Sequence, residues 1–200
     1  MEIDRRAFLA ASGACLAACG SPLPRSVPSG SRRLDALLAA NADVLPERAG
    51  AGANHYPMAG EVLETLERAD AIPDGWIVGT EGYAGAVRRA GSIEEDEGAL
   101  GDPARYGDWL DRFGVELAAD PWRAVVARHA PALAPGLAGG AFHGMLRTAH
   151  ACRALSRSYT AARRDELAVG LAYWASAWTE LRSRPDGSDQ PLHRVEHPWL

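Results

Sequence analysis

The sequence predicts an all-α protein, with about six or seven helices packed antiparallel in a single domain. Apolar residues recur at three- and four-residue steps in several stretches, which is the spacing of one helix face. Proline and glycine breaks separate these stretches from one another. No run alternates polar and apolar residues convincingly at period two, so no sheet is expected. A chain of 200 residues is long enough for one domain with a sizeable core.

The composition excludes several functional classes. The net charge is -5 and no basic stripe is present, which argues against nucleic acid as a partner. All 21 basic residues are arginine, so Schiff-base chemistry and a phosphate-binding P-loop lysine are excluded. Two of the 3 cysteines, Cys15 and Cys19, lie near the N-terminus and leave only Cys152 in the body. The body therefore has no internal disulfide framework.

Residues 1–18 are predicted to be a lipoprotein signal peptide of the twin-arginine type. The segment DRRAFL (4–9) resembles the twin-arginine export motif, and the apolar run that follows is too short to span a bilayer. The segment LAACG (16–20) resembles a bacterial lipobox, in which the Cys19 thiol would take the lipid. The alternative is an ordinary apolar helix start with a chance match to the lipobox.

The leader predicts an exported protein of the cell envelope. A lipid on Cys19 would anchor it on the outer face of the cytoplasmic membrane or in the periplasm, tethered to a membrane rather than inserted. Residues 19–33 are rich in Pro, Ser and Gly and are predicted to form a flexible tether. The twin-arginine route carries folded proteins, so it favours a cofactor acquired before export.

The helical domain is predicted to span residues 34–183. Its first helix, 32–44, ends at a Leu-Pro pair, and a Gly/Ala loop follows over 47–53. The second helix covers 57–69, with Pro57 in its first turn. Three glycines make the segment after Pro73 less regular.

Four elements complete the domain. The acidic stretch 92–102 is predicted to be a solvated loop rather than a metal site. Residues 105–119 carry apolar side chains at helical spacing, and the next helix starts at Pro121 and is expected to end before Pro131. Two further helices follow, the first with His143 and His150 and the second over 165–181. Thr160 is a plausible N-cap for the last helix, and residues 184–200 form a loose tail.

The helix after the Pro-Gly break at 135 contains the most informative histidines. His143 and His150 lie seven residues apart, about 700° around a helix, and so share nearly one face. That helix is apolar on several sides, so the imidazoles need buried partners, which a metal or an acidic substrate would supply. A rise of about 10.5 Å separates the two residues along the helix, which makes a shared metal ion harder to build. The alternative interpretation is that both are core histidines held by hydrogen bonds.

The other histidines divide between structural roles and one open case. His129 lies two residues before Pro131 and is interpreted as a capping or dipole partner at a helix end. His193 and His197 lie in the Pro-rich tail, which does not hold the helix that a metal pair four residues apart requires. His55 is open to the same two interpretations as His143 and His150.

Two segments resemble the bacterial questin oxidase-like family. These are NHYPM (54–58) and AFHGMLRTAHA (141–151), and together with the helices between and after them the resemblance covers about residues 50–181. It implies an oxygen-using oxidoreductase that oxidises or opens the rings of aromatic polyketides, linked either to NADPH or to non-haem iron. The iron alternative implies His55, His143 and His150 as catalytic ligands. No Gly-x-Gly-x-x-Gly follows a predicted strand, so NADPH rests on the resemblance alone.

The sequence also departs from the family. Arg147 stands where some members have a further histidine, and the family is usually longer. Arg147 is therefore either a counter-charge for an acidic phenolate or carboxylate or a residue of the helix surface. The prediction is a membrane-tethered oxidoreductase acting on a small aromatic molecule, with a partner chain left open. The alternative is a non-catalytic binding or structural lipoprotein on the same scaffold.

Overall fold

The computed structural model describes residues 31–48, 52–78, 87–94 and 98–180. The predicted signal peptide, nearly all of the tether and the predicted tail lie outside these residues. Seven α-helices occur within the described ranges, and they confirm the predicted all-α class. None of the described helices is long and apolar enough to cross a membrane. The helices are α2 (Ser31–Ala40), α3 (Tyr56–Thr65), α4 (Asp74–Val78), α5 (Tyr106–Ala119), α6 (Trp122–Leu133), α7 (His143–Arg157) and α8 (Ala161–Ser176).

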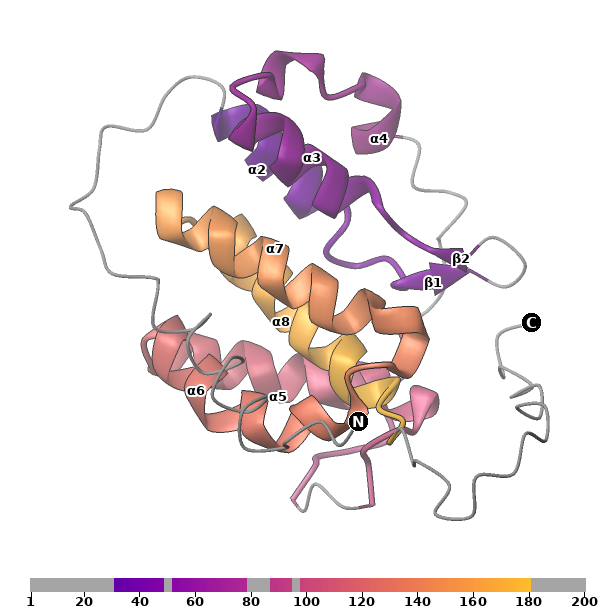
Figure 1. Ribbon diagram of the computed structural model, residues 1–200. Helices are drawn as coiled ribbons and strands as arrows, with labels where there is room; N and C mark the ends of the chain where they lie inside the picture. The colour runs from indigo at the N-terminus through magenta and orange to yellow at the C-terminus, as the bar shows by residue number, and fades with distance from the viewer. Residues whose placement is uncertain (1–30, 49–51, 79–86, 95–97, 181–200) are drawn as a thin grey trace, which may run out of the picture.

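Short elements connect the helices. Two strands of two residues, β1 (Glu47–Arg48) and β2 (Gly52–Ala53), pair antiparallel with Glu47 opposite Ala53. This small pair stands where a loop was expected, and it brings the start of α3 back beside the residues that follow α2 (Figure 1). The 3₁₀ turns are η1 (Ala69–Ala71), η3 (Pro103–Arg105), η4 (Ala134–Gly136) and η5 (Gly139–Phe142).

Helix α8 lies at the centre of the domain. Every residue from Glu166 to Ser176 is buried, as expected of a helix without a polar face. Helix α7 lies beside it, and the connection between them is too short for anything but an antiparallel pair (Figure 1). Helices α5 and α6 lie on one side of this pair and α2 and α3 on the other (Figure 1).

The buried side chains form two hydrophobic clusters. The larger one joins α5, α6, α7 and α8, and its aromatic members include Trp109, Phe113, Tyr173 and Trp174. The smaller one fills the space between α2, α3 and η1. Its buried members are Leu34, Leu37, Leu38, Ala69, Ile72 and Ala154, so Ala154 connects it to α7.

Glycines let α7 and α8 approach each other backbone to backbone. A Cβ atom on Gly144 would lie 2.5 Å from Cα of Trp174 and 2.6 Å from its backbone nitrogen. A Cβ atom on Gly170 would lie 2.8 Å from the backbone nitrogen of Thr148. Real Cβ atoms do not approach backbone this closely, so both positions require glycine. The glycine after His143 is therefore a packing residue of the central helix pair.

Several expected helix boundaries need correction, since α2, α3 and α8 end at Ala40, Thr65 and Ser176, four or five residues earlier than expected. Helix α6 continues through Pro131 to Leu133, so His129 lies inside the helix and not at its end. The His129 ring is buried, 2.7 Å from an Oε2 atom of Glu116 and edge-on to Phe113. It therefore pairs α6 with α5 rather than capping a helix. The N-cap at Thr160 is confirmed, since its hydroxyl accepts a hydrogen bond from the N–H of Arg163, but α8 begins at Ala161.

Replacing Gly144 by alanine should destabilise the protein by about 1–3 kcal/mol, because the new methyl group overlaps the backbone of α8. The matched control is Gly114→Ala on α5, where a Cβ atom meets nothing within 4 Å. That substitution should stabilise the helix by about 0.5–1 kcal/mol. Urea unfolding of both variants measures the difference, and equal effects would contradict the close approach at Gly144.

Candidate functional site

A sharp kink positions His143 as the first residue of α7. Three consecutive residues in η5 and at its end have left-handed backbone angles: Gly140 (φ 55), Ala141 (φ 50) and Phe142 (φ 69). Such angles are uncommon for residues other than glycine. Gly139 anchors the kink, since a Cβ atom there would lie 1.8 Å from the carbonyl oxygen of Ala177. The helix therefore starts at His143 rather than upstream of it.

The kink brings two of the predicted histidines together. The Nε2 atoms of His55 and His143 lie 3.0 Å apart, although the residues are separated by 88 positions in the sequence. The rings meet edge-on, with centroids 4.8 Å apart. His55 precedes α3 and is exposed, while His143 is half-buried. Solutes can therefore reach the pair from the His55 side, at the start of α3.

Hydrogen bonds determine where the protons of this pair lie. The Nδ1 atom of His143 is 2.8 Å from the carbonyl oxygen of Gly140, which can only accept, so this nitrogen carries a hydrogen. In the neutral ring Nε2 of His143 is then an acceptor, and Nε2 of His55 is the donor. The Nδ1 atom of His55 is left as the acceptor site of the pair.

His150 belongs to a different cluster. Its Nδ1 atom lies 2.7 Å from an Oε2 atom of Glu61, a carboxylate on α3 that is 2 % exposed. Arg153 and Arg157 of α7 donate to the same carboxylate. Burial alone would raise the pKa of Glu61, but the hydrogen bonds from His150 and both arginines outweigh it and lower the pKa to about 2. His150 therefore joins α3 to α7.

The three histidines do not form the expected iron site in this arrangement. Across the described ranges, no group of three or more His, Cys, Asp or Glu side chains has the geometry to hold a metal ion. His55 and His143 would supply two ligands, while the Nδ1 atom of His150 is taken by Glu61. The binding of iron or of NADPH stays a prediction.

Arg147 is buried, so its interpretation as a surface residue of the helix is wrong. It is 1 % exposed, and its Nε and Nη2 atoms donate to the two carboxylate oxygens of Glu166 on α8, at 2.6 and 2.9 Å. The carboxylate that Arg147 neutralises is therefore an internal one. Its third nitrogen, Nη1, has no hydrogen-bond partner among the described residues.

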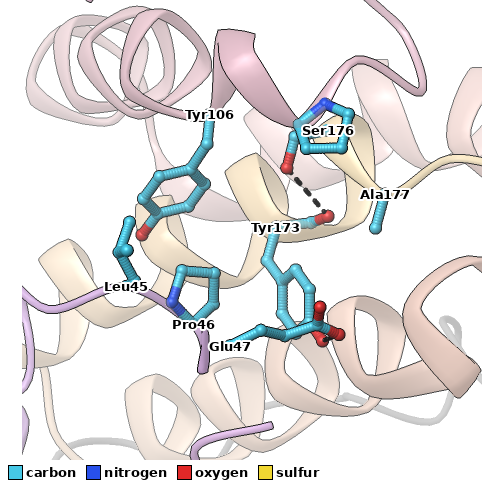
Figure 2. A pocket seen from close by; sticks show the side chains of 8 residues that line it. Leu45, Pro46, Glu47, Tyr106, Tyr173, Ser176 and Ala177 are labelled. Carbon is cyan, nitrogen blue, oxygen red and sulfur yellow. Dashed lines mark hydrogen bonds between the residues drawn. The ribbon is translucent and has the colours of Figure 1, made fainter. Parts of the chain in front are cut away.

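A small hollow lies between β1, η3 and the end of α8. Figure 2 shows the rings of Tyr106 and Tyr173 on its walls, with Leu45 and Pro46 beside them. The Tyr173 hydroxyl donates to the carboxylate of Glu47. Burial, followed by this bond to Glu47, raises the pKa of Tyr173 well above its usual range. The Tyr106 hydroxyl has no hydrogen-bond partner in the described part of the chain.

Gly140 connects the hollow with the histidine pair. Its carbonyl group holds His143, and a Cβ atom on Gly140 would lie 3.1 Å from the Tyr173 hydroxyl. Sequence reasoning missed Glu47, Tyr106 and Tyr173 as site residues. Both tyrosines belong to apolar helix patterns, which indicate a core position and give no sign that a hydroxyl faces a hollow.

Comparison with known proteins identifies no relative. The chain matches no protein family, no curated protein and no solved structure. The resemblance to the questin oxidase-like family therefore stays a prediction from the two sequence segments.

Replacing Arg147 by methionine should destabilise the protein by about 3–5 kcal/mol, because the Glu166 carboxylate would remain buried without a partner. The double variant Arg147→Met/Glu166→Leu should recover much of that loss, since no charge is then left in the core. Arg89→Met is the control, because Arg89 and Asp111 form an exposed pair worth at most about 1 kcal/mol. Denaturant unfolding that gave equal losses for both single variants would contradict the buried pair.

Glu61→Gln should lower the stability at neutral pH and remove an acid-sensitive contribution. The folded-state pKa of Glu61 lies at about 2, below its ordinary value of 4.5, so the stabilisation is complete above pH 4.5. It is lost as the pH falls from 4.5 through 2. Melting curves of both proteins should converge over this interval. Glu67→Gln, at an exposed position, controls for the loss of a surface charge.

Proposed function

We propose that the chain is an exported oxidoreductase that oxidises a small phenolic aromatic molecule with dioxygen. The observation that carries the proposal is the 3.0 Å contact between His55 and His143, which joins the two segments singled out in the sequence. The lipid anchor on Cys19 and the location in the cell envelope belong to the same proposal. They rest on the twin-arginine and lipobox motifs of the leader.

The histidine pair has the arrangement of a general base. The Gly140 carbonyl fixes the tautomer of His143, whose Nε2 atom accepts from the N–H of His55. A phenolic substrate at His55 would give its proton to Nδ1 of that ring. The resulting imidazolium keeps its N–H directed at the lone pair of His143, so its charge is stabilised and its orientation is held.

Proton removal prepares the substrate for oxidation. A phenolate is richer in electrons than a phenol and passes them more readily to dioxygen. His55 is exposed, so an aromatic molecule reaches it without opening the helical core. No step of this scheme requires a three-histidine iron.

The second candidate is a non-catalytic binding or structural lipoprotein. This candidate is favoured because two of the four predicted site residues make contacts that hold the helices together. His150 is held by Glu61, and Arg147 is paired with Glu166. These contacts stabilise the helix bundle whether or not any reaction takes place at its end.

The test is dioxygen uptake by the purified protein with 1,8-dihydroxyanthraquinone, measured without additions, with NADPH and with ferrous iron. The His55→Gln and His143→Gln variants should lose about 10²-fold or more of the rate, which is the usual contribution of a general base. His150→Gln is the matched control and should retain most of the rate, because glutamine can still donate to Glu61.

Two results would contradict this proposal. Equal loss of activity in all three variants, with one equivalent of iron bound, would support the three-histidine iron site instead. A folded protein without dioxygen uptake under any of the three conditions would favour the non-catalytic lipoprotein.

A further inference from the structure

Helices α2, α3 and α4 form a structural unit with a hydrophobic core of its own. This α2–α4 unit comprises residues 31–48 and 52–78, and the α5–α8 core comprises the other four helices. Five of the six buried members of the smaller hydrophobic cluster belong to the unit, and Ala154 of α7 is the sixth. The buried members of the larger cluster all lie between Ala99 and Ala175. The burial of apolar surface, which dominates folding, is therefore largely separate in the two parts of the domain.

The α2–α4 unit is held together by contacts within itself. Nδ2 of Asn54 donates to Oδ1 of Asn41 at 2.8 Å, and both residues are buried. The Asn41 amide also donates to the carbonyl oxygen of Trp76 on α4, at 3.3 Å. The rings of Trp76 and Tyr56, the first residue of α3, stack with their centroids 5.2 Å apart. These contacts would persist if the three helices moved as one body.

Opposite charges join the α2–α4 unit to α7 and α8. Arg163 of α8 is 0 % exposed and donates to Asp35 of α2 at 2.8 Å and to Glu64 of α3. The Glu61 carboxylate of α3 accepts from α7 side chains that include Arg157, at 2.6 Å. In each of these contacts the carboxylate belongs to the unit and the cation to α7 or α8. Charges separated in this way are typical of an interface between two complementary surfaces.

Apolar contact across the same boundary is small among the described residues. Ala154 and Ala162 are the members that α7 and α8 contribute to the smaller cluster, and each has a one-carbon side chain. Leu45 of the α2–α4 unit packs, partly buried, against the larger cluster. Hydrophobic stabilisation follows the apolar area that is buried, so two methyl groups and one leucine contribute little. The attachment of the unit therefore depends mainly on its ion pairs.

We propose that the α2–α4 unit docks on the α5–α8 core as one body and releases from it while that core stays folded. Proteins commonly open in such contiguous units, at a lower free energy than global unfolding requires. The unit is continuous along the chain, which passes from α4 on to α5, and Figure 1 shows its three helices grouped on one side of α7 and α8.

Release of the unit would dismantle the histidine pair. His55 directly precedes α3 and belongs to the α2–α4 unit, whereas His143 is the first residue of α7. Only the docked state therefore holds their Nε2 atoms 3.0 Å apart. The docking equilibrium would regulate the site in this way. The release itself is independent of the proposed oxidation, and only its effect on the rate rests on that function.

The test is native-state hydrogen exchange of the full chain at neutral pH, read by mass spectrometry of peptides from each helix. Peptides from α2 and α3 should share one opening free energy, lower than that of α5 and α8. Replacing Arg153 and Arg157 together by glutamine should raise the exchange rates of α2 and α3 alike by about tenfold, because Glu61 loses two charged donors. The rates in α5 and α8 should stay unchanged. Arg153→Gln alone should give a smaller rise in the same peptides.

Arg128→Gln is the matched control, because the Arg128 side chain is 50 % exposed and that of Arg153 is 51 % exposed. Arg128 pairs with Glu116 and Asp120, outside the α2–α4 unit, so its loss should leave exchange in α2 and α3 unchanged. Equal opening free energies in all helices would overturn the proposal, as would a uniform rise in every helix of the arginine variants. Unchanged exchange in α2 and α3 of the double variant would also overturn it. No substrate is present in this experiment, so an absence of oxidation would not alter its result.

Discussion

The bidentate ion pair between Arg147 and Glu166 is the contact on which the arrangement of the central helices depends. Both side chains are almost fully buried, and each comes from one helix of the α7–α8 pair. A buried charge without its partner is far more costly than the pair itself contributes, so a register that separated Arg147 from Glu166 would be strongly destabilised. The close backbone contacts at Gly144 and Gly170 agree with that register. The ion pair and the glycines thus specify the same packing by independent means.

This register also places the residues at the end of the domain. Gly144 is held against Trp174, and the chain just before α7 stays close to α8, with Gly139 against the carbonyl oxygen of Ala177. The left-handed residues from Gly140 to Phe142 make a sharp turn there, and they bring His143 to His55. The same turn lays Gly140 against the Tyr173 hydroxyl. The histidine pair and the hollow are therefore two consequences of how the central helices meet.

The spacing of apolar residues and the capping signals predicted the helices, but they could not predict the site. Helical spacing indicated α5 and α8, and Thr160 indicated the start of α8, because these features depend on neighbours within a few residues. The contact of His55 with His143 depends on a backbone turn at Ala141 and Phe142 that neither residue type favours. The burial of Arg147 depends on Glu166, nineteen positions away on another helix. Helical periodicity contains no information about such pairings.

The distribution of the histidines shows why sequence spacing misleads here. His143 and His150 share a helix face, yet they contact different neighbours, because α3 runs beside α7 with His55 at its start and Glu61 further along. A rise of about 10.5 Å separates His143 from His150 along α7. The Glu61 carboxylate, with its arginine partners, occupies the Nδ1 atom of His150. Of the three imidazoles, that of His55 is therefore the most exposed to solutes, and it lies in contact with His143.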